Sequence, residues 1–248
     1  MAAGQAKLPV GAVLSAAFGF VFGNLPAMTL VALVPLLLTF VAQGAAVYGL
    51  IDAEAAFVVV GAVLLLAAIV PFMTAWHRAT LFGLEHEPAR IGLAFGAREL
   101  RYILATFLLG LMGIATVAPG FALLAMGGAT PAVALALVAL GFVMLYLFAR
   151  FALVLPALAA GLPTGAGAAW RQSEGNGVRL AVVLFLAELP FRLLDALLTR
   201  FAAERLGLEA QLGFDIVSVV LAFLSIGVLV SALSTAYRIL AGPDQRSA

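Results

Sequence analysis

The 248-residue sequence contains no cysteine and few charged residues. The absence of cysteine excludes disulfides, thiolate catalysis and thiolate metal ligands. Charged residues make up 10% of the chain, compared with about 25% in ordinary soluble domains. The formal net charge is +1, so there is no basic excess to neutralise phosphates. We therefore expect no nucleic-acid partner.

Long apolar runs take the place of the missing charges. Hydrophobic residues make up 65% of the chain, and a bilayer accepts such side chains where water does not. A helix needs about 20 apolar residues to cross the hydrocarbon, and six runs have that length. We expect an all-α polytopic membrane protein with a single integral membrane domain over 1–248. The predicted spans cover 25–48, 54–76, 101–126, 130–156, 178–199 and 214–240.

The basic residues predict how these spans are oriented. Lysine and arginine gather in the cytoplasmic loops of membrane proteins. Arg200 and Arg205 lie on one side of the predicted spans, and Arg192 lies within the fifth. The other side carries Lys7, Arg78, Arg90, Arg98, Arg101, Arg150, Arg171, Arg179, Arg238 and Arg246. The bias predicts that both termini are cytoplasmic.

A weak internal repeat divides the chain into three units. Glycine-containing amphipathic segments at 10–24, 91–101 and 164–176 each precede a pair of predicted spans. Each unit is then an interfacial helix on the cytoplasmic side, followed by a helical hairpin. The first segment follows Lys7 and also resembles a signal peptide. A single lysine is a poor basic region, so we favour the interfacial helix.

Aromatic and basic side chains mark the cytoplasmic ends of the predicted spans and segments. Such side chains anchor membrane proteins at the level of the lipid headgroups. The residues expected to act as anchors are Trp76, Arg78, Arg150, Trp170, Tyr237 and Arg238.

Three stretches of the sequence carry a family resemblance. They are Arg150–Pro156, Ala168–Ser173 before the fifth span, and Ser234–Arg238 in the last span. Together they resemble a group of six-helix bacterial inner-membrane proteins, similar to the YciC-like proteins and to the membrane domain of glycerophosphodiester phosphodiesterases. The resemblance implies a six-helix fold in a bacterial inner membrane. Members of the group mostly have no known activity, so the resemblance implies a fold and no mechanism. The histidine and acidic residues needed for a metal-dependent phosphodiester site are missing from this sequence.

The fifth predicted span carries a polar stripe. Glu188, Arg192, Asp195 and Thr199 follow one another by four, three and four positions, so they share one helical face. Glu188 lies near the bilayer centre, where a lone charge costs about 2.5–3.5 kcal/mol, so Arg192 is its natural partner. The stripe is either a path for an ion, a proton or a lipid headgroup, or an ion pair that fixes helix packing.

The sixth predicted span offers a matching face. Asp215, Ser218 and Ser225 are spaced by three and seven positions. If this face meets the fifth span, the two stripes line a polar seam. Small hydroxylated residues also join membrane helices without any ligand, so both readings stay open.

No catalytic motif accompanies these residues. The sequence has no HExxH, nucleophile elbow, P-loop or dinucleotide fingerprint. The acidic turn Glu85-His86-Glu87, near His77, precedes Pro88 and is expected to be a solvated loop rather than a metal site. We therefore expect no enzyme, cofactor or metal. The favoured function acts through membrane lipids or a membrane-protein partner, and the alternative is a small transporter or channel along the fifth and sixth spans.

Cysteine labelling tests the predicted topology. Because the chain has no cysteine, Arg98→Cys, Arg171→Cys and Ala129→Cys variants each carry one reactive position. A membrane-impermeant maleimide applied to intact cells should label only Ala129→Cys, because the charge bias places both arginines in the cytoplasm. Permeabilised cells should label all three variants and provide the control. Labelling of Arg98→Cys and Arg171→Cys on opposite faces would overturn the topology.

Overall fold

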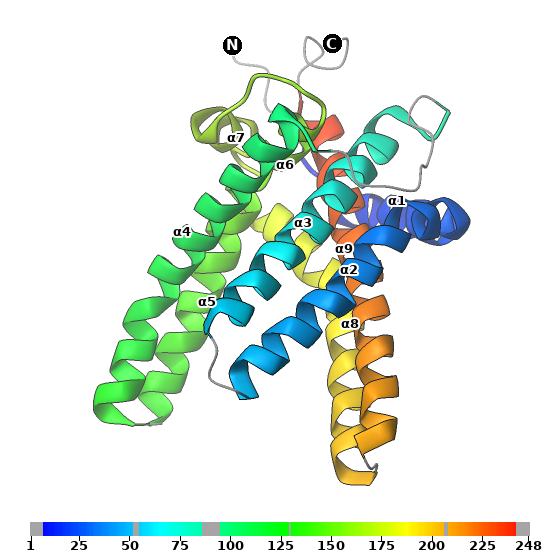
Figure 1. Ribbon diagram of the computed structural model, residues 1–248. Helices are drawn as coiled ribbons and strands as arrows, with labels where there is room; N and C mark the ends of the chain where they lie inside the picture. The colour runs from blue at the N-terminus through cyan, green and yellow to red at the C-terminus, as the bar shows by residue number, and fades with distance from the viewer. Residues whose placement is uncertain (1–6, 52–54, 86–94, 129, 206–207, 242–248) are drawn as a thin grey trace.

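The computed structural model describes residues 7–51, 55–85, 95–128, 130–205 and 208–241, and these form helices and no strand (Figure 1). The all-α prediction is confirmed. The helices are α1 (Val10–Gly23), α2 (Leu25–Ile51), α3 (Ala55–Phe82), α4 (Ala97–Gly127), α5 (Pro131–Phe151), α6 (Val154–Ala159), α7 (Ala166–Gln172), α8 (Gly177–Arg205) and α9 (Leu208–Leu240).

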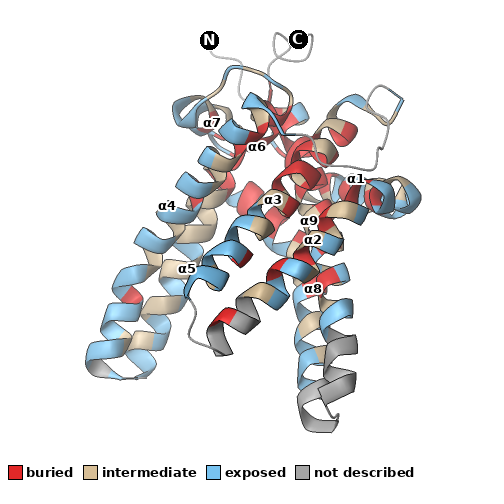
Figure 2. Ribbon diagram, viewed as in Figure 1, coloured by how far each residue is buried: buried red, intermediate tan, exposed pale blue. Residues whose placement is uncertain are grey.

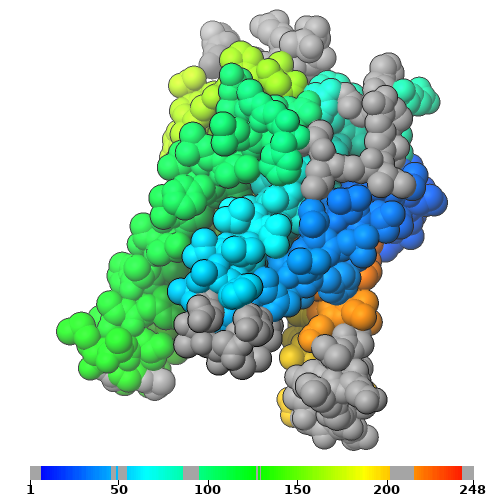
Figure 3. Space-filling model, viewed as in Figure 1, coloured from blue at the N-terminus to red at the C-terminus, as the bar shows by residue number. Residues whose placement is uncertain are grey.

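Three helical hairpins make up most of the molecule. They are α2–α3, α4–α5 and α8–α9, and the helices of each pair pack against one another. The hairpins converge at the end that carries α6 and α7 and spread apart at the other end (Figure 1). We call these the converging end and the spread end. In the space-filling view, α2 and α3 lie between the α4–α5 hairpin and the described part of α9, which is seen below them (Figure 3).

Five stretches of helix are long and apolar enough to cross a membrane. They are Leu25–Ala45, Ala55–Phe82, Ala97–Met126, Pro131–Ala159 and Asp215–Leu240. Helix α8 has 29 residues and packs against α9. The charges of Glu188, Arg192 and Asp195 interrupt its apolar character, so its role as a sixth span stays a prediction.

The hairpins expose apolar surface along much of their length. On α4 and α5, Leu104, Phe107, Ile114 and Phe142 are between 58% and 66% exposed (Figure 2). A soluble protein rarely presents so large a contiguous apolar surface to solvent. These side chains have the chemistry of groups that face lipid tails. The chain is accordingly an integral membrane protein.

The first predicted interfacial segment is a helix that packs along one stripe. Val13, Ala17 and Val21 of α1 are buried, at intervals of four residues, and α1 packs against α8 and α9. The Phe18 ring stacks on Phe191 of α8 with the centroids 6.1 Å apart. The remaining face of α1 is largely exposed. One face therefore holds the helix to the protein, and the other remains exposed.

The other two predicted segments have different outcomes. In the third, α7 forms from Ala166 to Gln172 and ends shortly before α8 begins at Gly177. In the second, residues 91–94 lie outside the described residues. The part of this segment that the structure describes leads into α4, which begins at Ala97.

Polar contacts tie the segment before α1 to the start of α8. The Leu8 amide donates to Asn176 Oδ1 at 2.8 Å, and Arg179 Nη1 donates to the Leu8 carbonyl at 3.0 Å. Leu8 and Asn176 are both buried. These bonds satisfy buried polar groups between segments far apart in the sequence, and they hold α1 beside α8.

Three of the predicted headgroup anchors are buried inside the protein. Trp76 is 0% exposed, Tyr237 is 5% exposed and Arg150 is 7% exposed. The prediction that these three anchor at the headgroups is wrong, because the hairpins converge around them and enclose their side chains. The anchors that remain half-buried or exposed are Arg78, Trp170 and Arg238.

Arg150 instead joins α5 to α7. Its guanidinium donates to Ser173 Oγ at 2.8 Å, to the Trp170 carbonyl at 2.6 Å and to the Tyr146 hydroxyl at 3.2 Å. The charge also lies 3.4 Å from the centroid of the Trp170 ring. A buried guanidinium needs several hydrogen-bond acceptors, and neutral groups supply them here.

Candidate functional site: a polar pocket between two hairpins

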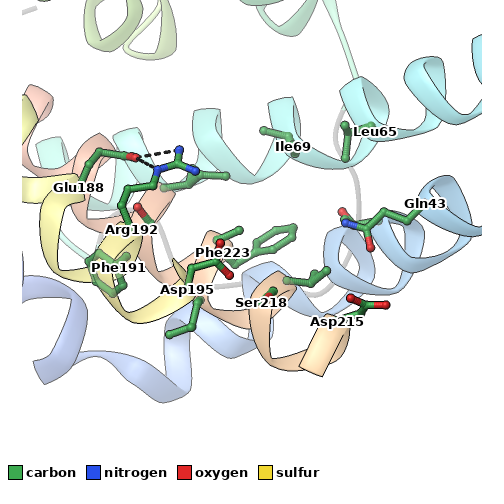
Figure 4. A pocket seen from close by; sticks show the side chains of 16 residues that line it. Gln43, Leu65, Ile69, Glu188, Phe191, Arg192, Asp195, Asp215, Ser218 and Phe223 are labelled. Carbon is green, nitrogen blue, oxygen red and sulfur yellow. Dashed lines mark hydrogen bonds and ion pairs between the residues drawn. The ribbon is translucent and has the colours of Figure 1, made fainter. Parts of the chain in front are cut away.

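A pocket of about 280 Å³ lies between the α2–α3 hairpin and the α8–α9 hairpin (Figure 4). Six of the seven polar residues singled out in the fifth and sixth predicted spans line this pocket. They are Glu188, Arg192 and Asp195 of α8 and Asp215, Ser218 and Ser225 of α9.

The two polar stripes meet because α8 and α9 pack side by side. Glu188, Arg192 and Asp195 recur every three to four residues, so they follow one face of α8. Ser218 lies one turn beyond Asp215, and Ser225 lies two further turns along α9. The expected seam between the two stripes is therefore present. Its opposite wall comes from α2, through Gln43, and from α3, through Leu65 and Ile69.

Thr199 does not belong to the pocket. Helix α8 carries it one turn beyond Asp195, where it is exposed and absent from the lining. The tip of the α8–α9 hairpin extends past the ends of α2 and α3 (Figure 1). At that level no second hairpin is present to enclose a cavity. Thr199 therefore lies outside the set of predicted polar residues that line the pocket.

Glu188 and Arg192 form the expected ion pair. Arg192 Nε and Nη2 each lie 3.0 Å from Glu188 Oε2 (Figure 4). The Arg192 side chain is 74% exposed and the Glu188 side chain 23% exposed. The pair thus forms an open edge of the pocket and is not locked inside the helix packing.

Two polar atoms of the pocket lack partners among the described residues. They are Asp195 Oδ1 and Ser225 Oγ, and both atoms are buried. Ser225 as a whole is only 5% exposed. A buried polar atom without a hydrogen bond costs about 1–3 kcal/mol. The pocket therefore contains acceptors that a bound group with hydrogen-bond donors would satisfy.

Helix α2 contributes two polar residues that the sequence analysis missed, Thr39 and Gln43. Thr39 Oγ1 donates to the Pro35 carbonyl at 2.9 Å, so it is satisfied within its own helix. Gln43 is exposed and directs its amide towards the pocket (Figure 4). Their spacing of four residues in an otherwise apolar span was the available signal, because it places both on one helical face.

Aromatic rings close the pocket towards the converging end. Phe223 of α9 lines the pocket and meets Phe72 of α3 edge to face, with the ring centroids 5.1 Å apart. Trp76 lies one turn further along α3 and stacks near Phe72 at 6.4 Å. These rings separate the pocket from the buried core beyond them.

Beyond the rings lies a second set of buried polar groups. Trp76 Nε1 donates to Ser231 Oγ at 3.0 Å. The His77 ring contacts Ser234 Oγ at 2.7 Å and the Tyr102 hydroxyl at 3.1 Å. These contacts join α3, α4 and α9, and the indole and both imidazole nitrogens have partners. In contrast to the pocket, this set is a satisfied packing interface.

A second groove of about 370 Å³ runs between α4 and the α6–α7 region. Leu104, Leu108, Phe151 and Leu158 supply apolar walls, and Arg101 contributes to the lining. The groove is thus mostly hydrophobic with a cation among its lining residues. This combination suits an acyl chain beneath a phosphate group.

The acidic and histidine side chains are the residues that could form a metal site. Among the described residues, no three His, Asp or Glu side chains come close enough together to hold a metal ion. His86 and Glu87 of the predicted solvated turn lie outside the described residues. His77, which is near that turn in the sequence, is engaged by Ser234 and Tyr102 instead.

Two serines on α9 provide a matched test of which polar groups hold the fold. Ser231→Ala removes the acceptor of the buried Trp76 Nε1–H group and should destabilise the protein by about 1–3 kcal/mol. Ser225→Ala removes a hydroxyl without a partner among the described residues, so stability should stay unchanged or rise. Thermal unfolding in detergent without added ligand measures both. Equal losses of stability in the two variants would contradict the conclusion that the Ser231 hydroxyl stabilises the fold and the Ser225 hydroxyl does not.

Comparison with known proteins found no relative. No family model matches the chain, and no curated protein or solved structure matches it either. The resemblance to six-helix bacterial inner-membrane proteins therefore stays a prediction, and function is inferred from the pocket.

Proposed function

We propose that this chain is a non-enzymatic, multi-pass protein of a bacterial inner membrane that binds a polar ligand within the bilayer. The observation that carries the proposal is the pocket between the two hairpins. Six predicted polar residues line it, and two of its buried acceptors have no partner among the described residues. Polar groups at membrane depth commonly mark a substrate or ion site.

The arrangement of basic residues supports cytoplasmic termini. Arg101 lies near the start of α4, Arg150 near the end of α5 and Arg179 near the start of α8. These helix ends all belong to the converging end, on the same side as the segments before α1 and after α9. A concentration of arginines at one end is typical of the cytoplasmic side. The pocket then opens in the half of the membrane away from the cytoplasm.

Membrane lipids are the partners that the surface favours. The pocket lies between hairpins whose outer faces are apolar, so lipids surround it. The α4 groove adds a second place where an acyl chain and a phosphate would fit. A membrane-protein partner would use the same apolar faces. Nucleic acid, cofactors and a catalytic role have no support in the residue types present.

Filling the pocket tests ligand binding. Ala222 lines the pocket and is exposed, so Ala222→Trp should occupy the cavity with little strain. Wild-type protein and variant are reconstituted in phosphatidylethanolamine–phosphatidylglycerol nanodiscs, and retained small molecules and lipids are identified by native mass spectrometry. The wild type should hold at least one molecule that Ala222→Trp loses. Ala134 lies on the exposed face of α5, so the control variant Ala134→Trp should retain the same molecule as the wild type. Identical retention by all three would refute the proposal.

Transport is the second candidate, and one observation favours it. Polar side chains continue along α9 from Asp215 through Ser225 to Ser231 and Ser234, so they span most of the helix. The Phe72–Phe223 contact is the apolar interruption between the pocket and the buried polar groups beyond. Such an arrangement resembles a path closed by an aromatic gate.

Proteoliposome flux separates transport from binding alone. If the pocket is part of a path, Glu188→Gln or Arg192→Leu should reduce the flux at least tenfold, because each removes one member of the ion pair at its edge. Glu174→Gln removes an exposed carboxylate outside the pocket and serves as the control. The measured probes are protons and small monovalent ions. The absence of flux through the wild type would exclude a path for them.

A further inference from the structure

We propose that the pocket between the two hairpins selects an organic cation, in which an ammonium group is attached to an apolar body. This inference rests on the proposed ligand-binding role and adds the charge and the chemical class of the ligand. It follows from three independent features of the cavity, namely its charge balance, its unpartnered atoms and its walls.

The charge balance of the pocket is negative. Three carboxylates line it, those of Glu188, Asp195 and Asp215, and Arg192 supplies the only guanidinium among the described lining residues. Arg192 is already bound to Glu188. Asp195 and Asp215 have no basic partner among the residues that the structure describes. Asp195 is half-buried and Asp215 is exposed where they line the pocket, and carboxylates at membrane depth favour a nearby cation.

The unpartnered atoms match a donor. Asp195 Oδ1 can accept a hydrogen bond, and so can Ser225 Oγ. Ser225 is only 5% exposed. An ammonium group has three donors and no acceptor, so it matches atoms that can accept a hydrogen bond. An anion would meet two uncompensated carboxylates. The buried hydroxyl is thus an observation separate from the acidic residues themselves, and it points to the same ligand.

The walls and the volume suit an organic cation better than a metal ion. Phe191 and Phe223 line the pocket with aromatic rings, and Ile69 and Val219 add aliphatic surface. Aromatic faces attract ammonium groups. The pocket of about 280 Å³ has more room than a single ion or water molecule needs. The acidic side chains do not converge into a metal-binding group in the described residues.

Two sources present this chemistry, a lipid headgroup amine and a soluble lipophilic amine. Both carry an ammonium group next to an apolar or flexible body. The pocket lies among lipid-facing helices, so a headgroup reaches it from the membrane. Its position towards the spread end also admits a soluble amine from the non-cytoplasmic side. The experiment below distinguishes them.

Charge-selective modification tests the inference. Ser218 lines the pocket and is half-buried, and the chain contains no other thiol, so Ser218→Cys reports on the cavity alone. The rates of reaction with aminoethyl and sulfonatoethyl methanethiosulfonate are measured on purified protein in detergent. Their ratio is divided by the ratio at Ala132→Cys, an exposed site at the start of α5. We expect the cationic reagent to be favoured at least tenfold at Ser218→Cys.

Two further variants assign the selectivity to the pocket. Adding Asp195→Asn, which keeps the side-chain shape, should lower the rate ratio at least threefold. Adding Glu174→Gln, which removes one negative charge outside the pocket, should leave the ratio unchanged. Equal reaction with both reagents would overturn the cation inference while leaving a polar ligand pocket intact. Failure of Ser218→Cys to react with either reagent would overturn the pocket and the inference together.

Protection experiments identify the source of the ammonium group. Hexylammonium, but not hexanoate, should slow the modification of Ser218→Cys if soluble amines bind. Nanodiscs containing phosphatidylethanolamine should slow it more than nanodiscs of phosphatidylglycerol alone if the lipid headgroup binds. Protection by hexanoate, or the absence of protection in both experiments, would contradict the proposed ligand class.

Discussion

In a bilayer, hydrocarbon offers no hydrogen bonds, so every polar group at membrane depth must find a partner inside the protein or in a ligand. This constraint explains why the described residues form helices, since a helix satisfies its own backbone. It also explains why the polar side chains gather where hairpins meet. The outer faces of α4 and α5 remain apolar, whereas Glu188, Asp195 and Ser225 of α8 and α9 line the pocket beside α2 and α3.

The constraint is met in two different ways along α9. Ser231 and Ser234 have partners on α3, and these bonds join the helices of the converging end. Ser225 lies on the same helix and is equally buried, yet its hydroxyl has no partner among the described residues. Hydroxyl groups of one chemical type thus hold the fold in one place and line a cavity in another. The difference lies in the neighbours: ring nitrogens of α3 reach Ser231 and Ser234, whereas no described side chain bonds to the Ser225 hydroxyl.

The converging end shows how enclosure changes the role of a residue. At the end of an isolated membrane helix, Arg150 would reach towards the headgroups. Here α7 folds back over α5, so the guanidinium is enclosed and bonded to Ser173 and the Trp170 carbonyl. Trp76 is similarly surrounded by Phe20 and Phe72. The side chains of Arg150 and Trp76, which were predicted to contact lipid headgroups, therefore contact other segments of the protein instead.

The sequence by itself determined the fold class, the hairpin order and most of the polar site, because hydropathy and helical spacing are local properties. Glu188, Arg192 and Asp195 share a face wherever α8 lies. Only the tertiary structure decided that this face meets α2, so that Gln43 joins the pocket and Thr199 does not. It also decided which anchors are buried. These outcomes depend on how the hairpins are placed relative to one another, and contacts between distant segments set that placement.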